Sequence, residues 1–163
     1  MLYYKTGDLL DAPQIYIAHQ VNCQGVMGSG VAKAVREKYP KAYEWYIGKC
    51  RCDNSKKLLG FCQKVPITAE PPKEILNLFG QLNYGYDGRQ YTSYTALTIA
   101  LNDAFKYIIQ QNSYYGDKKE IAIPYKMGCD RGGGDWKVVE SILRDLSEKY
   151  NIDVYVYSLE GYI

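Results

Sequence analysis

The sequence predicts an α/β fold, with a mostly parallel sheet covered by helices on both faces. Strand-like and helix-like stretches alternate along the chain, which is typical of this class. The run Ile121-Ala122-Ile123 is apolar in succession, as expected for a parallel strand buried on both faces. Two neighbouring strand-like stretches, 57–65 and 74–80, have no helix between them, so we also expect one antiparallel element.

The expected strands follow from short runs rich in β-branched and aromatic residues. They are residues 2–5, 15–21, 57–65, 74–80, 120–124 and 152–157. Pro71 and Pro72 predict a loop over residues 68–73, because proline cannot occupy a central strand. Gly85, Asp87 and Gly88 predict a second loop over residues 83–90.

Three helices are strongly indicated, over residues 29–39, 92–111 and 135–150, and a shorter helical segment is indicated over 41–49. Pro40 ends the first, Thr92 or Ser93 caps the second and Asp135 caps the third. Apolar residues at helical spacing give each helix one apolar face, and we expect that of the third helix to face inward. The three sets are Val31, Ala34, Val35 and Tyr39; Leu97, Leu101, Ala104, Phe105 and Ile108; and Val139, Ile142, Leu143 and Leu146.

Length and composition indicate one domain over residues 1–163, a monomer located in the cytoplasm. A net charge of +2 from 20 basic and 18 acidic residues does not indicate a nucleic-acid or membrane surface. An odd number of cysteines, no signal peptide and no apolar run of about 18 residues favour free thiols in a reducing compartment. A single histidine and scattered cysteines do not indicate a metal site, and no cofactor is expected.

Two glycine-rich turns each leave a strand-like segment and enter a helix. The first covers residues 22–32, and the second covers residues 124–136. Their glycines allow close backbone approach, and the N–H groups of the following helices favour an anion. Neither turn has the spacing of a P-loop or of G-x-G-x-x-G, which disfavours an NAD-binding domain. A diphosphate between two helix N-termini is the simplest ligand, although each turn is also compatible with a plain tight connection.

Asp8 follows the first strand and has two interpretations. Its carboxylate can accept hydrogen bonds from an exocyclic amine such as N6 of adenine, or it can cap a helical turn at Leu9-Leu10. The local sequence is compatible with both.

Three blocks, taken in order, resemble macrodomains over nearly the whole chain. They are Thr6-Gly7-Asp8-Leu9-Leu10, the segment from His19 to Ala32 containing Asn22-Cys23-Gln24-Gly25-Val26-Met27-Gly28-Ser29-Gly30, and Pro124-Tyr125-Lys126-Met127-Gly128-Cys129 with Gly132-Gly133-Gly134-Asp135-Trp136. The subgroup it resembles includes terminal ADP-ribose glycohydrolases and ADP-ribose 1''-phosphate phosphatases. The resemblance implies a three-layer α/β/α fold and an ADP-ribose cleft. It also implies hydrolysis at the distal ribose, of a 1''-phosphate or of an ester to a protein or nucleic acid. The alternative is a module that binds ADP-ribose or another nucleotide without chemistry.

The resemblance also implies roles for individual residues. Asp8, helped by the Leu9 amide, matches the adenine-recognising acid, and Tyr157 matches a residue that lines the adenine pocket. The loop around the distal ribose is matched by Asn22, Gly25, Met27, Gly28, Ser29, Gly30 and Val31. The loop around the diphosphate is matched by Gly128, Cys129, Asp130, Arg131, Gly132, Gly133 and Gly134.

The chain departs from the glycohydrolase pattern at two catalytic positions. Gln81 stands where that subgroup has a lysine, and Gly132 stands where it has an aspartate, with Asp130 two residues earlier. We therefore expect no lysine adduct, and instead a water molecule oriented by Asp130, His19 or Asn22, with Asp135 as a further acid. His19 is also compatible with a structural role in a buried strand, and Asp135 with simple capping. Neither Cys23 nor Cys129 is expected to act as a nucleophile.

Overall fold

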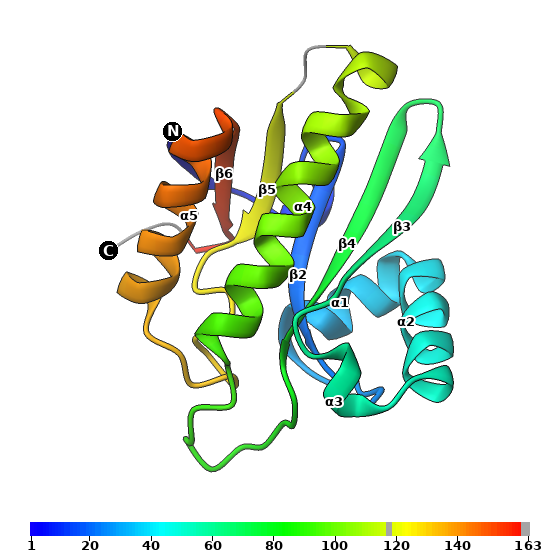
Figure 1. Ribbon diagram of the computed structural model, residues 1–163, viewed down its shortest axis with the longest axis vertical. Coiled ribbons are helices and arrows are strands. Elements are labelled where there is room, and N and C mark those ends of the chain that lie inside the picture. Colours follow the sequence, from blue (N-terminus) through cyan, green and yellow to red (C-terminus); the bar gives the residue numbers. More distant parts are fainter. Residues whose placement is uncertain (117–118, 161–163) are drawn as a thin grey trace.

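The computed structural model describes residues 1–116 and 119–160 of the chain. Its centre is a six-stranded sheet in the order β1-β6-β5-β2-β4-β3 (Figure 1). The strands are β1 (Leu2–Thr6), β2 (Tyr16–Asn22), β3 (Cys62–Ala69), β4 (Pro72–Gln81), β5 (Glu120–Pro124) and β6 (Asp153–Ser158). All neighbours are parallel except the β3–β4 hairpin, so the predicted mixed, mostly parallel sheet is confirmed.

Helices cover both faces of this sheet and complete three layers (Figure 1). They are α1 (Gly30–Lys38), α2 (Pro40–Cys52), α3 (Ser55–Leu58), α4 (Tyr94–Tyr115) and α5 (Trp136–Tyr150), with a 3-10 turn, η1 (Leu9–Asp11), after β1. Alternate residues of β2 divide between the layers, as strand geometry requires. Tyr16 and Ala18 pack with α4 and α5, whereas Ile17 packs with Val35 of α1 and Ala42 of α2.

The caps of the long helices explain where these begin. Asp135 accepts a hydrogen bond from the Lys137 amide at 2.9 Å, which confirms it as the N-cap of α5. Ser93, rather than Thr92, caps α4 by accepting from the Ala96 amide at 3.1 Å. The inward face predicted for α5 is confirmed, with three of its residues buried and Ile142 partly buried against the core.

One prediction on the α1–α3 side was wrong. Residues 57 and 58 lie in α3 instead of a strand, because the Asn54 side chain caps a helical turn there, and β3 begins only at Cys62. On α1, Val35 is buried but Val31 and Ala34 are exposed. Their apolar side chains face a cleft instead of the core, which hydrophobic periodicity alone does not distinguish.

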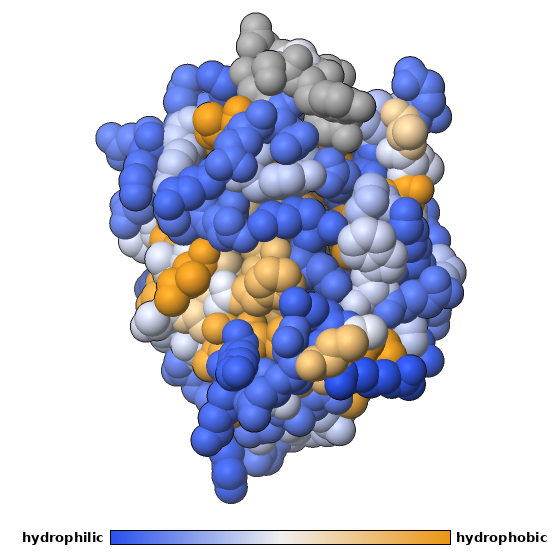
Figure 2. All heavy atoms as spheres, turned by 45° about the vertical axis from the view of Figure 1, so that its right-hand side comes forward, coloured by the Kyte–Doolittle hydropathy of each residue, from blue (hydrophilic) through white to orange (hydrophobic). Residues whose placement is uncertain are grey.

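The loop predicted around Pro71 is shorter than expected. It is the tight turn of the β3–β4 hairpin, and Pro72 is tolerated because it is the first residue of β4. On the face that carries this hairpin and α2, hydrophilic side chains predominate and hydrophobic ones gather toward the middle (Figure 2). None of the helices within the described residues has the length and apolar character needed to cross a membrane.

Candidate functional site

A cleft runs along the carboxyl ends of the parallel strands, where open α/β sheets bind ligands. It consists of two adjoining chambers. The β2 chamber, of about 250 Å³, is lined by residues after β2, β4 and β5. The β1 chamber, of about 730 Å³, is lined by η1, α1 and the end of β6. Both include Gly30, Val31, Pro124, Tyr125 and Lys126, so the chambers meet there and form one elongated groove.

Asp8 takes the capping role, one of the two predicted for it, and also lies in the β1 chamber. One carboxylate oxygen accepts a hydrogen bond from the Leu10 amide at 2.9 Å and so caps η1. The residue, with Leu9, Leu10 and Tyr157, also lines the chamber. Capping engages one oxygen atom, and the other remains able to accept a hydrogen bond from a ligand.

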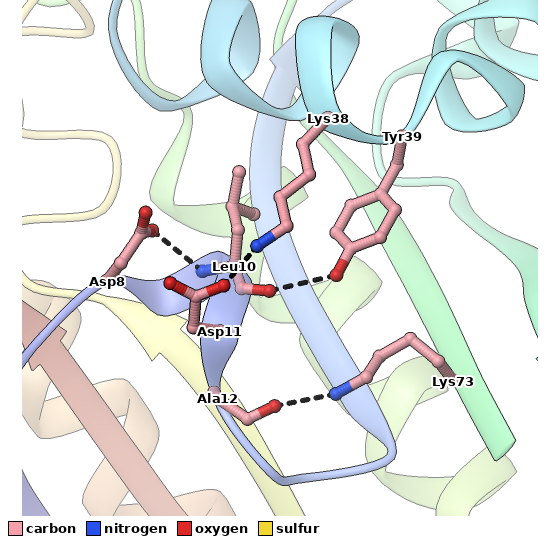
Figure 3. Close-up of polar contacts among 7 residues, drawn as sticks. All are labelled: Asp8, Leu10, Asp11, Ala12, Lys38, Tyr39 and Lys73. Carbon is pink, nitrogen blue, oxygen red and sulfur yellow. Dashed lines mark hydrogen bonds and ion pairs between the residues drawn. The ribbon is translucent and has the colours of Figure 1, made fainter. Parts of the chain in front are cut away.

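Neighbouring elements hold the η1 turn in place (Figure 3). The Tyr39 hydroxyl donates to the Leu10 carbonyl at 2.9 Å, and Lys38 forms an ion pair with Asp11. The Lys73 ammonium donates to the carbonyl of Ala12 at 2.7 Å and to that of Gln14 at 2.6 Å. Contacts from α1, the α1–α2 junction and β4 therefore fix the position of Asp8, although no local sequence signal indicates them.

The first glycine-rich turn is organised by Asn22 and a residue that the sequence did not indicate, Tyr46. The Asn22 amide donates to the Val26 carbonyl at 2.8 Å, and its Oδ1 accepts from the Gln24 amide at 2.9 Å. The buried Tyr46 hydroxyl lies 2.7 Å from Asn22 Oδ1 and accepts from the Gly25 and Val26 amides, both at 3.1 Å. Asn22 lines the β2 chamber, but its side-chain hydrogen bonds shape the turn.

The predicted residues of this turn divide into two groups. Gly28, Ser29, Gly30 and Val31 line the β2 chamber. Gly25 and Met27 line neither chamber: the Gly25 amide is directed to Tyr46, and Met27 is buried beside Tyr46. Ser29 occupies the N-cap position of α1 without a side-chain hydrogen bond to the helix, so no cap side chain engages the first N–H groups of α1 at the cleft.

The second glycine-rich turn also divides. Gly128, Asp130, Arg131 and Gly132 line the β2 chamber. The other three predicted contacts, Cys129, Gly133 and Gly134, line neither chamber. Gly133 has φ +68°, and a Cβ there would lie 2.3 Å from the Arg89 carbonyl oxygen, so close backbone packing requires this glycine.

A partly buried hydrogen-bond network joins β2, the end of β4, the β4–α4 loop and the second glycine-rich turn. The Gln20 amide donates to Gln81 Oε1 and to the Thr92 hydroxyl, both at 2.8 Å, and that hydroxyl donates to the Gly128 carbonyl at 2.6 Å. Gln81 lines the β2 chamber where the resemblance places a lysine, and its own amide donates to the Asn83 carbonyl. This position is therefore uncharged and held by hydrogen bonds.

The loop between β4 and α4 forms a wall of the β2 chamber. Tyr84, Gly85 and Tyr86 line the chamber, whereas Arg89 pairs with Asp87 and lines neither chamber. The Arg131 guanidinium lies over the Tyr86 ring, 4.2 Å from its centroid. No glycine or charge pattern predicted these aromatic side chains.

His19 lies at the base of the β2 chamber and is 1% exposed. Its Nε2 is 2.6 Å from Asn77 Oδ1. The Asn77 amide group already donates to Ala42 and Gln63, so Asn77 Oδ1 must accept and Nε2 carries the proton. Nδ1 is then a buried acceptor with no hydrogen-bond partner among the described residues. Burial lowers the pKa of His19 to about 4, so the ring is neutral at physiological pH.

The remaining candidate groups lie outside the cleft lining or are not activated. Asp135 caps α5 and lines neither chamber. Burial raises the pKa of Cys23 to about 12 and that of Cys129 to about 11, so both are protonated thiols and poor nucleophiles. Among the residues that the structure describes, no three His, Cys, Asp or Glu side chains gather as a metal site.

Comparison with known proteins places this cleft in a family. The family model described as Macro domain matches residues 18–143. The chain belongs to the macrodomain family. The predicted resemblance and the three-layer macrodomain fold are thereby confirmed.

Relatives of this macrodomain include two kinds of named hydrolase. An ADP-ribose 1''-phosphate phosphatase of Scheffersomyces stipitis is 30% identical over 177 residues, which cover 96% of this chain and 99% of that protein. A DNA ADP-ribosyl glycohydrolase of Mycobacterium tuberculosis is 27% identical and matches 99% of this chain, but the match covers only 43% of that protein.

Solved macrodomains share the fold over almost the full chain. The macrodomain of Mycobacterium tuberculosis DarG has a TM-score of 0.79 and 27% identity, covering 96% of this chain and 97% of that one. Thermosipho africanus DarTG in complex with ADP-ribose has a TM-score of 0.71 and 21% identity, covering 98% of this chain and 43% of that one.

Proposed function

We propose that this macrodomain binds ADP-ribose along the cleft and hydrolyses an ADP-ribose derivative at the distal ribose. The observation that carries the proposal is the single groove with chemically different ends. Asp8 lies at one end, the N-terminus of α1 lies in the middle, and His19, Asn22 and Asp130 lie at the other. The names of the curated relatives support both the nucleotide and the hydrolysis.

The geometry supports one orientation of the ligand. Adenine would lie in the β1 chamber, where the free carboxylate oxygen of Asp8 can accept from its N6 amine. The diphosphate would lie where the chambers meet, beside Gly30 at the start of α1 and the ammonium of Lys126. The distal ribose would then occupy the β2 chamber, which contains the three proposed catalytic residues.

The residues of the β2 chamber favour activation of water over covalent chemistry. Asp130 is an exposed carboxylate, and His19, which also lines the chamber, has a buried and unprotonated Nδ1 that can accept a hydrogen bond. For ADP-ribose 1''-phosphate, the oxygen of the attacking water bonds to phosphorus as the bond between phosphorus and the 1''-oxygen breaks. One proton of the water passes by way of a neighbouring acceptor to that leaving oxygen, so the products are ADP-ribose and inorganic phosphate. Gln81 cannot form the adduct of a lysine mechanism because an amide nitrogen is not nucleophilic.

The alternative is a module that binds ADP-ribose without turnover. It is favoured by Gln81 and Gly132, which stand where the glycohydrolase pattern has a lysine and an aspartate. Single-turnover incubation with ADP-ribose 1''-phosphate, ADP-ribosylated protein and ADP-ribosylated DNA, together with calorimetric titration of ADP-ribose, separates the two. Turnover that Asp130→Asn abolishes while ADP-ribose still binds supports the enzyme. Binding without turnover of any substrate supports the module, and no binding refutes both.

Two broader expectations from the sequence also stand as proposals. We propose a monomer in the cytoplasm that meets nucleic acid only as a modified substrate. Size-exclusion chromatography with light scattering tests the oligomeric state, and fractionation of the source cells tests the location.

A further inference from the structure

Charged side chains are distributed unequally along the cleft. Asp8 and Glu160 line the β1 chamber only, Lys126 lies where the chambers meet, and Arg131 lies in the β2 chamber beside Asp130. A ligand that carries an amine at one end and negative charge in the middle and at the far end complements this arrangement. The resemblance implies a diphosphate contact for Arg131, but the orientation proposed above assigns the β2 chamber to the distal ribose and the diphosphate to the junction beside Lys126. The distal ribose of unsubstituted ADP-ribose carries no negative charge that Arg131 could pair with there.

Arg131 is a cation that no carboxylate in residues 1–116 and 119–160 neutralises within 4.0 Å. It is exposed, and its guanidinium lies 4.2 Å from the centroid of the Tyr86 ring. Stacking on a ring engages the face of the guanidinium, so the N–H groups at its edge remain able to donate. Arg131 lines the β2 chamber.

Tyr86 is on a loop that other contacts hold against the second glycine-rich turn. The Tyr91 hydroxyl donates to Asp87 at 2.9 Å, and the Tyr91 amide donates to the Gly132 carbonyl at 2.7 Å. A Cβ on Gly85 would lie 2.2 Å from the Tyr91 hydroxyl oxygen, so the loop backbone lies directly against that side chain. The Tyr86 ring is therefore placed beside Arg131 by the loop that carries it, although 64% of the residue is exposed.

We propose that Arg131, positioned by Tyr86, is the specificity-determining residue that binds a phosphate group on the distal ribose. This inference rests on the proposed function and assigns its substrate class, a phosphate monoester of ADP-ribose. The guanidinium matches the geometry of phosphate oxygens and can donate two parallel hydrogen bonds to them. Tyr86 acts through Arg131, because the ring restricts the orientations that the guanidinium adopts.

The test compares the complete chain with Arg131→Met, Tyr86→Leu and Tyr86→Phe, and uses Arg89→Met as the matched control. Arg89 is an exposed arginine of the same rim that pairs with Asp87 and lines neither chamber. We would measure kcat and KM for ADP-ribose 1''-phosphate and the calorimetric Kd for ADP-ribose. If a variant shows no turnover, its Kd for ADP-ribose 1''-phosphate replaces KM.

For Arg131→Met we expect KM for ADP-ribose 1''-phosphate to rise roughly 10- to 100-fold, because a charge-assisted bidentate contact is lost. The Kd for ADP-ribose should change less than about twofold. Tyr86→Leu should raise KM by a smaller factor, Tyr86→Phe should restore the original KM because it retains the ring, and Arg89→Met should leave all values unchanged.

Unchanged preference for ADP-ribose 1''-phosphate over ADP-ribose in Arg131→Met would overturn the inference, as would equal weakening of both ligands. Equal KM values for Tyr86→Leu and the unmodified chain would overturn the role of Tyr86. A chain that binds ADP-ribose but does not prefer its 1''-phosphate refutes this inference and leaves the proposed binding function standing. A chain that binds neither ligand refutes the proposed function itself.

Discussion

Replacing Tyr46 by phenylalanine tests whether one buried hydroxyl organises the first glycine-rich turn. The side chain is fully buried, and its oxygen accepts from the amides of Gly25 and Val26 at 3.1 Å. It also donates to Asn22, whose carbonyl oxygen and Oδ1 lie 2.8 and 2.7 Å away. Phenylalanine keeps the ring and its packing against Phe79, so the change removes hydrogen bonds without a large cavity.

The expected cost follows from these contacts. A hydrogen bond contributes about 1 kcal/mol net, and a buried donor left without a partner costs roughly 1–3 kcal/mol. Two amides lose their acceptor, but Gly25 and Val26 are only partly buried, so water can compensate in part. We expect Tyr46→Phe to lower the free energy of unfolding by about 2 kcal/mol. If the turn loses its preferred conformation to a similar extent, the affinity for ADP-ribose should fall by up to about 30-fold, since each 1.4 kcal/mol is a factor of about ten.

Urea denaturation and calorimetric titration with ADP-ribose measure these two effects. Tyr150→Phe is the matched control, because its hydroxyl makes one hydrogen bond, to Asn102 Oδ1 at 2.6 Å, between α5 and α4. The control should cost about 1 kcal/mol and leave the affinity unchanged. If Tyr46→Phe loses less than about 0.5 kcal/mol and binds ADP-ribose normally, the turn does not depend on this hydroxyl and our reasoning is wrong.

Three further predictions concern separate parts of the cleft. Asp8→Asn should keep the cap of η1, whereas Asp8→Ala should lose about 1 kcal/mol of stability; calorimetry should show both binding ADP-ribose roughly tenfold or more weakly. The pKa of His19 is 6.5 in the unfolded chain and about 4 in the folded chain. As the pH falls, the unfolded chain therefore takes up this proton before the folded chain does. The free energy of unfolding should therefore be highest above pH 6.5 and should fall by about 3 kcal/mol as the pH is lowered to 4. Urea denaturation at a series of pH values should show this fall in the unmodified chain, and His19→Gln should lack the part that His19 contributes. Gly133→Ala should lose more than about 2 kcal/mol in thermal unfolding because its Cβ meets the Arg89 carbonyl, whereas Gly88→Ala, also at positive φ but in open space, should lose about 1 kcal/mol.

Much of the fold could be predicted because its signals are local. Apolar continuity indicated β5, a capping aspartate indicated the start of α5, and the missing helix between two strands indicated the antiparallel pair. The same local patterns indicated the edge of the sheet that carries the cleft, since both glycine-rich turns follow parallel strands. They were wrong for residues 57 and 58, where a side-chain cap and a tight turn outweighed strand-like composition.

The functions of individual glycines were harder to predict. A glycine indicates that the backbone needs space or a positive φ, but not which group approaches it. Gly28 and Gly30 border the cleft, whereas Gly133 packs against the backbone of the β4–α4 loop. Met27 and Cys129, between such glycines, pack inward instead of toward a ligand.

The sequence by itself determined the family, the order of the elements and the two turns that border the cleft, because each depends on residues close together in the chain. Only the tertiary structure decided how these turns are held and what forms the remaining wall. Gln20 meets Thr92 across 72 positions, and Arg131 meets Tyr86 from a different loop. Such contacts depend on how strands and helices pack together, and a linear pattern of residues carries no signal for pairs that only folding brings together.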